Sequence, residues 1–235
     1  MTAPELAARI ASLTTPLVAD ACQQLGRPVR CAPSELAALV RGTPIAGPAL
    51  PVRHHGSVDV FLEAMDGAAR GDVLVIDNEG RRDEACVGDL IALEAASAGV
   101  AGLVVWGSVR DSAELVEIGL PVYSIARCPA GPRGQRAPTA ATPRDVRLGS
   151  LRVTAGDVVF ADDDGVVLVD AGEVAAVLDA ADDIARRERA QAQRIREGHS
   201  LRAQLRFAEY LAQRANDPSL TFREHLRRLG GAVEV

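Results

Sequence analysis

The stretch GDLIALEAASAGVAGLVVWGSVRD, residues 88–111, contains a helix pattern followed by a strand pattern and decides the fold. Its first half, residues 88–99, begins with Gly-Asp and ends at a glycine, as many helices do. Residues 100–107 form a continuous apolar run, which is typical of a strand buried on both faces. The order of the two halves predicts a helix that leads into a strand of a parallel sheet.

The pattern repeats on both sides of this stretch. The runs GDVLVID (71–77) and LPVYSIA (120–126) are short and apolar, so they predict two more buried strands. Residues 111–119, DSAELVEIG, predict a short helix between the second and third strands. Three strands alternating with two helices predict an α/β fold with parallel βαβ connections.

Further elements are expected around this unit. Helices are expected at 4–12, 17–25, 57–68, 171–197, 200–214 and 221–228, short strands and turns at 40–53, and two strands around DDDG within 151–170. Residues 127–149 are dense in Pro, Gly and Arg, so they predict a loop of the kind that is often functional. Arg133 in this loop either reaches a substrate or lies in solvent, and the sequence leaves both readings open.

Composition excludes several classes of function. The chain has 235 residues, of which 48% are apolar and 25% charged, and a net charge of −6, which argues against a nucleic-acid partner. The sequence lacks the long apolar stretch of a membrane span and the basic, then apolar, start of a signal peptide, so we expect a cytoplasmic protein. The four cysteines form no C-x-x-C pair, so we expect reduced thiols and no zinc site.

One absence bears directly on chemistry. All 26 basic residues are arginine, and the sequence contains no lysine. Schiff-base catalysis and the phosphate-binding lysine of a P-loop are therefore excluded. Carbonyl chemistry in this chain would need another electrophile, and a metal ion is the natural choice.

Two polar pairs follow predicted buried segments. Gly88-Asp89 opens a helix after an irregular segment, where backbone N–H groups attract anions, although Asp89 could simply cap the helix. Arg110-Asp111 follows a strand directly, and ligand sites in open parallel sheets lie beyond such strand ends, although an Arg-Asp turn is common. The pairs are 21 positions apart, which one helix and one strand fill, so both should emerge at the same sheet edge.

The sequence resembles a known family. The segments LTTPLVADAC, GDVLVIDNEG, GVAGLVVWGSVRD, GLPVYSIA and AGDVVFADDDGVVLV, together with the spaced GD and RD pairs, are similar to the family that contains the 4-hydroxy-4-methyl-2-oxoglutarate/4-carboxy-4-hydroxy-2-oxoadipate aldolases and the RraA-type regulators of ribonuclease E. The resemblance covers residues 10–198. It implies a swivelling β/β/α domain at 1–198, a helical C-terminal extension at 199–235, and a homotrimer or hexamer with its active site between subunits.

The resemblance also implies roles for the two polar pairs. Arg110 would bind the carboxylate or oxo group of a pyruvyl unit, and Asp111 would hold a divalent metal, Mg²⁺ or Mn²⁺. Asp89 would orient a water molecule or the hydroxyl group of the substrate. The substrate carboxylate would lie on backbone amides at the start of the helix, which belong to Gly88, Asp89, Leu90 and Ile91 and extend to Ala92.

A glutamate from a neighbouring subunit completes the site in the aldolases of this family. Counting back from Gly198 makes Glu188 the best match and Glu197 the second. This residue does not follow from the spacing of the two pairs, so it rests on the resemblance alone.

The implied activity is aldol cleavage of a 4-hydroxy-2-oxo acid that releases pyruvate, with oxaloacetate decarboxylation as a side activity because the same enolate forms. Two alternatives stay open. One is a non-catalytic RraA-like protein that binds a ribonuclease, and the other is a lyase or hydratase that acts on a sugar-derived oxo acid. The methyltransferase name attached to some family members finds no support, since no G-x-G-x-x-G loop is present.

Overall fold

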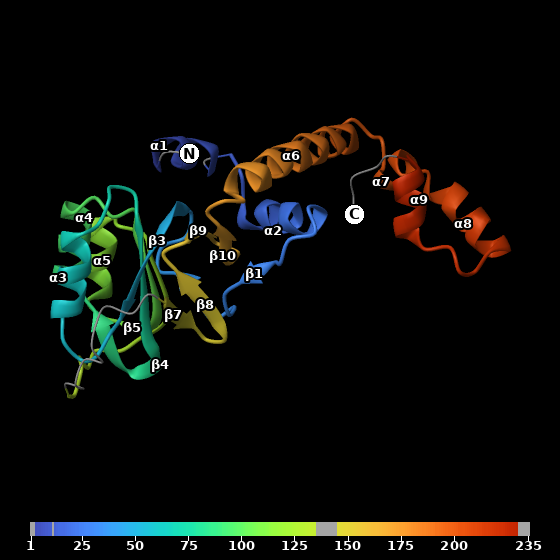
Figure 1. Cartoon of the computed structure of the whole chain (residues 1–235). Helices are drawn as coiled ribbons and strands as arrows, with labels where there is room; N and C mark the ends of the chain where they lie inside the picture. Colours follow the sequence, from blue (N-terminus) through green and yellow to red (C-terminus); the bar gives the residue numbers. More distant parts are fainter. Residues whose placement is uncertain (1–2, 11, 135–144, 230–235) are drawn as a thin grey trace.

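The computed structural model describes residues 3–10, 12–134 and 145–229, and shows an α/β domain from which the C-terminal helices extend (Figure 1). An eight-stranded sheet runs in the order β1-β10-β9-β3-β4-β5-β6-β2. Its strands are β1 (Arg30–Cys31), β2 (Ala37–Ala38), β3 (Ile45–Arg53), β4 (Val73–Val87), β5 (Gly102–Val109), β6 (Val122–Arg127), β9 (Asp157–Asp162) and β10 (Gly165–Asp170). A separate hairpin consists of β7 (Asp145–Leu148) and β8 (Leu151–Thr154).

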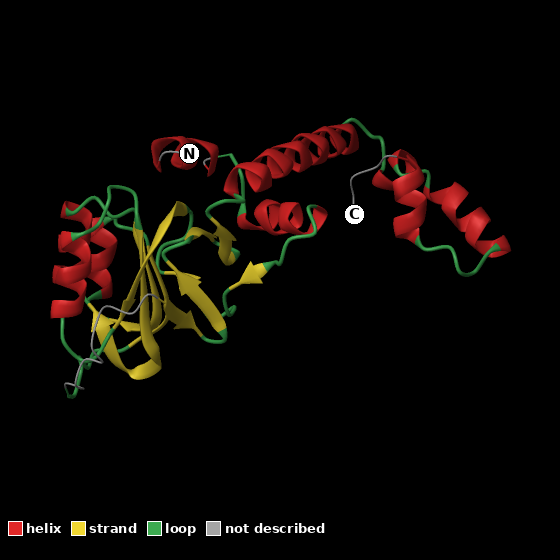
Figure 2. Ribbon diagram, viewed as in Figure 1, coloured by secondary structure: helices red, strands yellow, loops and turns green. Residues whose placement is uncertain are grey.

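The described helices fall into three groups. They are α1 (Ala3–Ile10), α2 (Thr15–Gln24) and α6 (Val174–Arg196); α3 (Asp59–Asp66), α4 (Asp89–Ser97) and α5 (Ser112–Ile118); and α7 (Leu201–Gln204), α8 (Phe207–Asn216) and α9 (Phe222–Leu229). Figure 2 shows the second group side by side along one face of the sheet. None of the described helices combines the length and apolarity that crossing a membrane requires.

The parallel centre of the sheet confirms the predicted βαβ units. Strands β3, β4, β5 and β6 pair in parallel, and α3, α4 and α5 connect them in turn. Alternation along β4 divides its side chains between two cores, because successive residues point to opposite faces. Leu74 and Ile76 pack under the three helices, whereas Val73 and Val75 pack in a second core on the other face.

The β7–β8 hairpin covers that second core and makes the fold a three-layer β/β/α arrangement, as the family resemblance implies. Val146 and Leu148 of β7 and Val153 of β8 join Val75 in one buried cluster. The expectation of a loop throughout 127–149 is therefore wrong at 145–148, where DVRL alternates buried and exposed residues and pairs with β8. Residues 135–144 of that expected loop lie outside the described residues.

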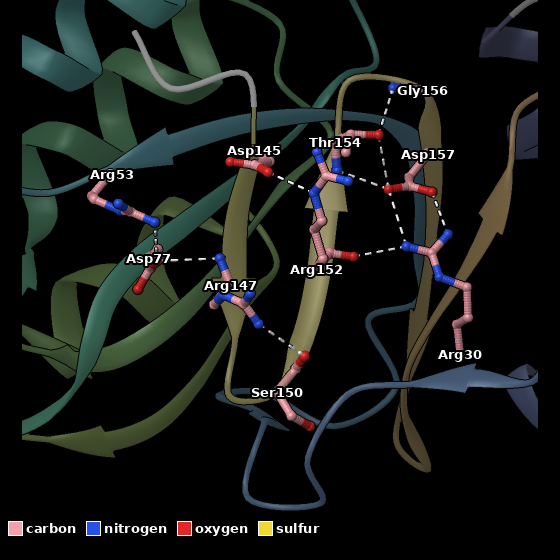
Figure 3. A network of polar contacts seen from close by, with 10 residues as sticks. All are labelled: Arg30, Arg53, Asp77, Asp145, Arg147, Ser150, Arg152, Thr154, Gly156 and Asp157. Atoms are coloured by element: carbon pink, nitrogen blue, oxygen red, sulfur yellow. Dashed lines mark hydrogen bonds and ion pairs between the residues drawn. The ribbon is translucent and has the colours of Figure 1, made fainter. Parts of the chain in front are cut away.

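Polar contacts join the hairpin to the main sheet (Figure 3). The buried carboxylate of Asp157 on β9 accepts hydrogen bonds from both terminal nitrogens of Arg30, and Nη2 of Arg30 also donates to the carbonyl oxygen of Arg152 at 2.7 Å. On the neighbouring strand the backbone N–H of Arg147 donates to Oδ2 of Asp77 at 3.2 Å. These contacts fix the second β layer at both of its strands.

Strand β4 is longer than the sequence indicates. Residues 78–87, expected to be irregular, belong to the strand, but its pairing with β5 shifts register after Asp77, after Arg81 and after Ala85. The backbone turns at Glu79 and Gly80, both of which have positive φ. Such bulges are hard to read from sequence because the extra residues break the alternation that marks a strand.

The C-terminal helices extend beyond the end of α6, away from the sheet (Figure 1). The predicted single helix at 200–214 is divided, because Arg206 adopts a left-handed conformation between α7 and α8. Tyr210, Phe222 and His225 form an aromatic cluster between α8 and α9. The division into a domain at 1–198 and an extension at 199–235 remains a prediction.

Candidate functional site

The ends of β4 and β5 bring the two polar pairs together. The strands are parallel neighbours, so their carboxyl ends meet at one sheet edge, where β4 ends at Val87 and β5 at Val109. The backbone N–H of Arg110 donates to the carbonyl oxygen of Val87 at 2.9 Å. The prediction that both pairs emerge at the same edge is therefore confirmed.

Gly88 is required at this junction for space. Its backbone is extended, with φ −135° and ψ −165°, so any residue could adopt its conformation. A Cβ atom at this position, however, would lie 2.3 Å from Oδ2 of Asp111 and 3.2 Å from Nε of Arg110. The missing side chain allows the Arg-Asp pair to lie directly against the start of α4.

Asp111 lies at the N-cap of α5 in a left-handed conformation, with φ 57° and ψ 46°. Asp tolerates this region better than most residues, yet strained backbone of this kind concentrates at functional sites. Its carboxylate makes no side-chain cap to α5, and Oδ2 instead lies 3.3 Å from Nε of Arg110 and 3.4 Å from the backbone N of Asp89. The carboxylate thus faces α4 and not its own helix.

Asp89 occupies the first turn of α4, where the helix dipole favours negative charge. Its Oδ1 accepts a hydrogen bond from the backbone N–H of Leu90 at 2.7 Å. The amides of Asp89 and Leu90, two of those expected to hold a substrate carboxylate, therefore have acceptors within the chain. A bound carboxylate would have to replace these two aspartate oxygens or use other amides of the turn.

A cavity of about 180 Å³ opens beside these residues. Its lining includes five of the predicted site residues and several neighbours: Gly88, Asp89, Leu90, Ile91 and Arg110, with Val58, Ala85, Cys86, Val87 and Pro132. Sites for drug-sized ligands usually measure roughly 300–1,000 Å³, so this cavity suits a smaller molecule. A short acid that presents its charge to Arg110 has the appropriate size.

Comparison with known proteins now identifies the family. A match to the RraA-like family, described as Aldolase/RraA, extends over residues 15–168. The chain belongs to the Aldolase/RraA family.

Solved structures agree with this assignment to the Aldolase/RraA family. A protein from Pseudomonas syringae pv. tomato str. DC3000 is 25% identical with a TM-score of 0.72, and the match covers 82% of this chain and 92% of that one. Streptomyces coelicolor RraAS2, described as an unusual member of the RNase ES inhibitor RraA protein family, is 28% identical with a TM-score of 0.71 and coverage of 81% and 98%. A Geobacillus kaustophilus HTA426 protein, described as S-adenosylmethionine:2-dimethylmenaquinone methyltransferase, is 31% identical with a TM-score of 0.56 and coverage of 65% and 93%.

The donor atoms at the site suit a divalent metal that keeps water ligands. Within the described ranges, no group of three or more His, Cys, Asp or Glu side chains is placed to hold an ion. The site instead offers two carboxylates, Asp89 and Asp111, at neighbouring helix starts. Mg²⁺ commonly binds proteins through one or two carboxylates and keeps several water ligands, so this donor set fits a hydrated Mg²⁺ or Mn²⁺ and not a closed protein cage.

Burial disfavours the reactive thiolate form of Cys86, the cysteine in the cavity wall. Burial raises the pKa of the Cys86 thiol to about 12, and the group contacts the carbonyl oxygen of Ser108 at 3.9 Å. A thiol with this pKa stays protonated near neutral pH, and the thiolate is the reactive form. All four cysteines are free of disulfides.

The predicted glutamates lie apart from the cavity in a single chain. Glu188 is exposed on α6, and Glu197 is the C-cap residue that follows the helix. Helix α6 packs beside α2 on a different part of the molecule from α4 and α5 (Figure 1). Neither residue lines the cavity. A role for Glu188 in the site therefore requires a neighbouring subunit and remains a prediction.

Part of the lining of the cavity was not predicted from the sequence. Val58 reaches the cavity from the start of α3, and Ala85 and Pro132 reach it from segments that were expected to be irregular. The position of Val58 in the sequence could have indicated its place in the cavity. It follows the end of β3, and β3 is the parallel neighbour of β4, so the carboxyl ends of both strands lie at the same sheet edge. The prediction of a functional loop at 127–149 was the signal for the return of residues 130–133, although Pro132 and not Arg133 lines the cavity.

Proposed function

We propose that this protein is a divalent-metal-dependent lyase that cleaves a 4-hydroxy-2-oxo acid and releases pyruvate. The observation that carries the proposal is the convergence of Asp89, Arg110 and Asp111 at Gly88, where a side chain would collide with the pair. A small cavity lies at this convergence, and the chain belongs to a family that includes aldolases.

Asp111 would hold Mg²⁺ or Mn²⁺, with water molecules as further ligands. When bound there, the cation would supply a Lewis acid for the 2-oxo group of the substrate. The sequence contains no lysine, so an iminium on a lysine side chain is not available as the electron sink.

Arg110 would bind and polarise the pyruvyl half of the substrate. Its planar guanidinium suits the two oxygens of a carboxylate, and its fixed charge would lie near the oxygen on which the enolate charge develops. Charge that is aimed in advance at a developing oxyanion often makes the largest contribution to catalysis. The neighbouring Asp111 carboxylate keeps the guanidinium oriented through its contact with Nε at 3.3 Å.

The bonds that break and form in the reaction indicate which groups must transfer protons. The hydroxyl group at C4 loses its proton to Asp89, directly or through one water molecule, and becomes a carbonyl group as the C3–C4 bond breaks. The bonding electrons remain on C3 as the enolate of pyruvate, which then takes a proton at C3. Glu188 of a neighbouring subunit, in a homotrimer or hexamer, would be the second group available for proton transfer.

Oxaloacetate decarboxylation follows from the same assignment. Loss of CO₂ from C4 leaves its bonding electrons on C3 and forms the same enolate. The residues that bind and stabilise the pyruvyl half therefore serve both substrates.

A second candidate is a binding protein that regulates a ribonuclease without catalysis. Its support is the 28% identity to Streptomyces coelicolor RraAS2 over 98% of that chain. A regulator of this kind needs neither a metal nor the hydroxyl-to-carbonyl chemistry, so one activity measurement separates the two candidates.

The test is pyruvate release from 4-hydroxy-4-methyl-2-oxoglutarate and from oxaloacetate with Mg²⁺ or Mn²⁺, and then with a chelator. We expect turnover that the chelator abolishes, and turnover of neither substrate with either metal would refute the proposal. Arg110→Ala and Asp111→Ala should each lose nearly all activity while remaining folded, and wild-type activity in Asp111→Ala would contradict the metal assignment. Glu188→Gln should lower kcat more than Glu197→Gln, since only the first is assigned to the site.

A further inference from the structure

Glu84 is a buried carboxylate next to the cavity that has no part in the proposed chemistry. Its residue is 3% exposed, and burying a carboxylate is costly unless the charge is paired. Its Oε1 accepts a hydrogen bond from Nη1 of Arg81. Its Oε2 accepts the backbone N–H of Arg133 at 3.2 Å, which joins the bulged part of β4 to the segment after β6.

The segment after β6 is attached to the sheet edge at three more points. The N–H of Cys128 donates to the carbonyl oxygen of Val109 at 3.0 Å, and the N–H of Ala85 donates to the carbonyl oxygen of Ala130 at 2.7 Å. The Arg133 side chain also donates to the carbonyl oxygen of Asp83 at 3.4 Å. Among these contacts only the bond to Glu84 uses a buried charged acceptor, and such bonds are roughly twice as strong as neutral ones.

The segment lies against the guanidinium of Arg110. A Cβ atom at Gly131 would lie 2.8 Å from Nη1 of Arg110, closer than side chains normally approach. The next residue, Pro132, lines the cavity. Arg110 is therefore confined between two glycine backbones, Gly88 on the α4 side and Gly131 on the β6 side.

We infer, on the basis of the proposed function, that Glu84 is a positioning residue for Arg110. Its carboxylate holds residues 130–133 in place, and the backbone at Gly131 then limits where the guanidinium can lie. A side chain as long as arginine has several rotatable bonds, and a wall on each side removes much of that freedom before the substrate arrives. Glu84 thus acts through the segment on substrate binding and does not touch the substrate.

Two variants test the inference from opposite sides. Gly131→Ala leaves every hydrogen bond of Glu84 intact and displaces only the end of the Arg110 side chain. Glu84→Ala removes the one charged acceptor among the contacts that hold the segment and leaves Gly131 unchanged. In both variants KM should rise and kcat/KM for pyruvate release should fall about 10- to 100-fold, since Arg110 binds the substrate carboxylate as well as the developing enolate and a misplacement of about 1 Å can cost about 100-fold.

Three measurements separate positioning from a purely structural role. Loss of folded enzyme lowers the apparent kcat and leaves KM unchanged, whereas a misplaced Arg110 raises KM. Glu84→Gln keeps an oxygen that can accept the Arg133 N–H, so it should recover part of the loss. Asp83→Ala removes the adjacent, exposed carboxylate and should behave as the wild type, which controls for the change in charge.

Hydrogen exchange gives a readout that does not depend on activity. The amides of Cys128, Ala130, Gly131 and Arg133 should exchange faster in Glu84→Ala than in the wild type. Faster exchange with an unchanged KM would overturn the inference, and so would a wild-type KM in Gly131→Ala. An inactive wild type would instead contradict the proposed function, and the exchange rates would then still decide whether Glu84 holds the segment.

Discussion

Gly88→Ala is the most direct perturbation of the candidate site. The new methyl group would lie 2.3 Å from Oδ2 of Asp111, whereas non-bonded atoms normally settle at about 3.5 Å, so the carboxylate must withdraw by about 1 Å. The backbone of Gly88 already has φ −135°, so the substitution introduces no backbone strain. The whole effect therefore falls on the positions of Asp111 and Arg110.

The expected cost is large for activity and small for stability. A misplacement of about 1 Å can lower the rate about 100-fold, which corresponds to about 2.7 kcal/mol of transition-state stabilisation. The side chains of Arg110 and Asp111 are 46% and 36% exposed, so they can move without opening the core. We expect the free energy of unfolding to fall by about 1 kcal/mol, the lower end of the usual overpacking penalty.

The assay is steady-state pyruvate release with Mg²⁺, accompanied by urea unfolding of the same preparation. Gly67→Ala is the matched control, because the nearest atom to its new Cβ is a carbonyl oxygen at 3.9 Å and its φ is −98°. The control should keep the wild-type kcat/KM. Activity of Gly88→Ala equal to that of the control would refute the prediction, and so would a loss of activity only in proportion to the unfolded fraction.

Two further predictions concern other parts of the molecule. Burial opposes ionisation of Asp157, but hydrogen bonds from Arg30 and Thr154 outweigh this effect and lower the pKa of Asp157 in the folded protein. The ionised carboxylate therefore contributes its full stabilisation of the fold above the unfolded pKa of about 3.9, and this contribution is lost as the pH falls through the lower pKa of the folded protein. Asp157→Asn should therefore lower the free energy of unfolding by about 2 kcal/mol at pH 7 and by progressively less below pH ~3.9, and a pH-independent difference in urea unfolding would contradict this. Iodoacetamide at pH 8 should modify the exposed Cys31 and should not modify Cys86 until the protein unfolds, because burial raises the pKa of Cys86 to about 12. Equal labelling of the two cysteines in peptide mapping would contradict this prediction.

Much of the parallel core could be predicted from local patterns. Residues 73–76 and 102–105 are apolar because both faces of the sheet are covered, and a run that is buried on both faces has a recognisable composition. The adjacency of Gly88 and Arg110 could also be predicted from the sequence, since one helix and one strand return the chain to the neighbouring parallel strand. Strand β7 could not be predicted from the sequence, because a four-residue strand is too short for its alternation of apolar and polar residues to distinguish it from a loop.

The sequence by itself determined the residue types available for chemistry: no lysine, an Arg-Asp pair after a buried strand, and an aspartate at a helix start. Only the tertiary structure decided how those groups are held. The left-handed turn at Asp111, the space at Gly88 and the return of Gly131 to Arg110 all depend on contacts between residues far apart in the chain. Local sequence patterns report propensity and burial, whereas the position of a side chain within an ångström is set by the atoms packed around it.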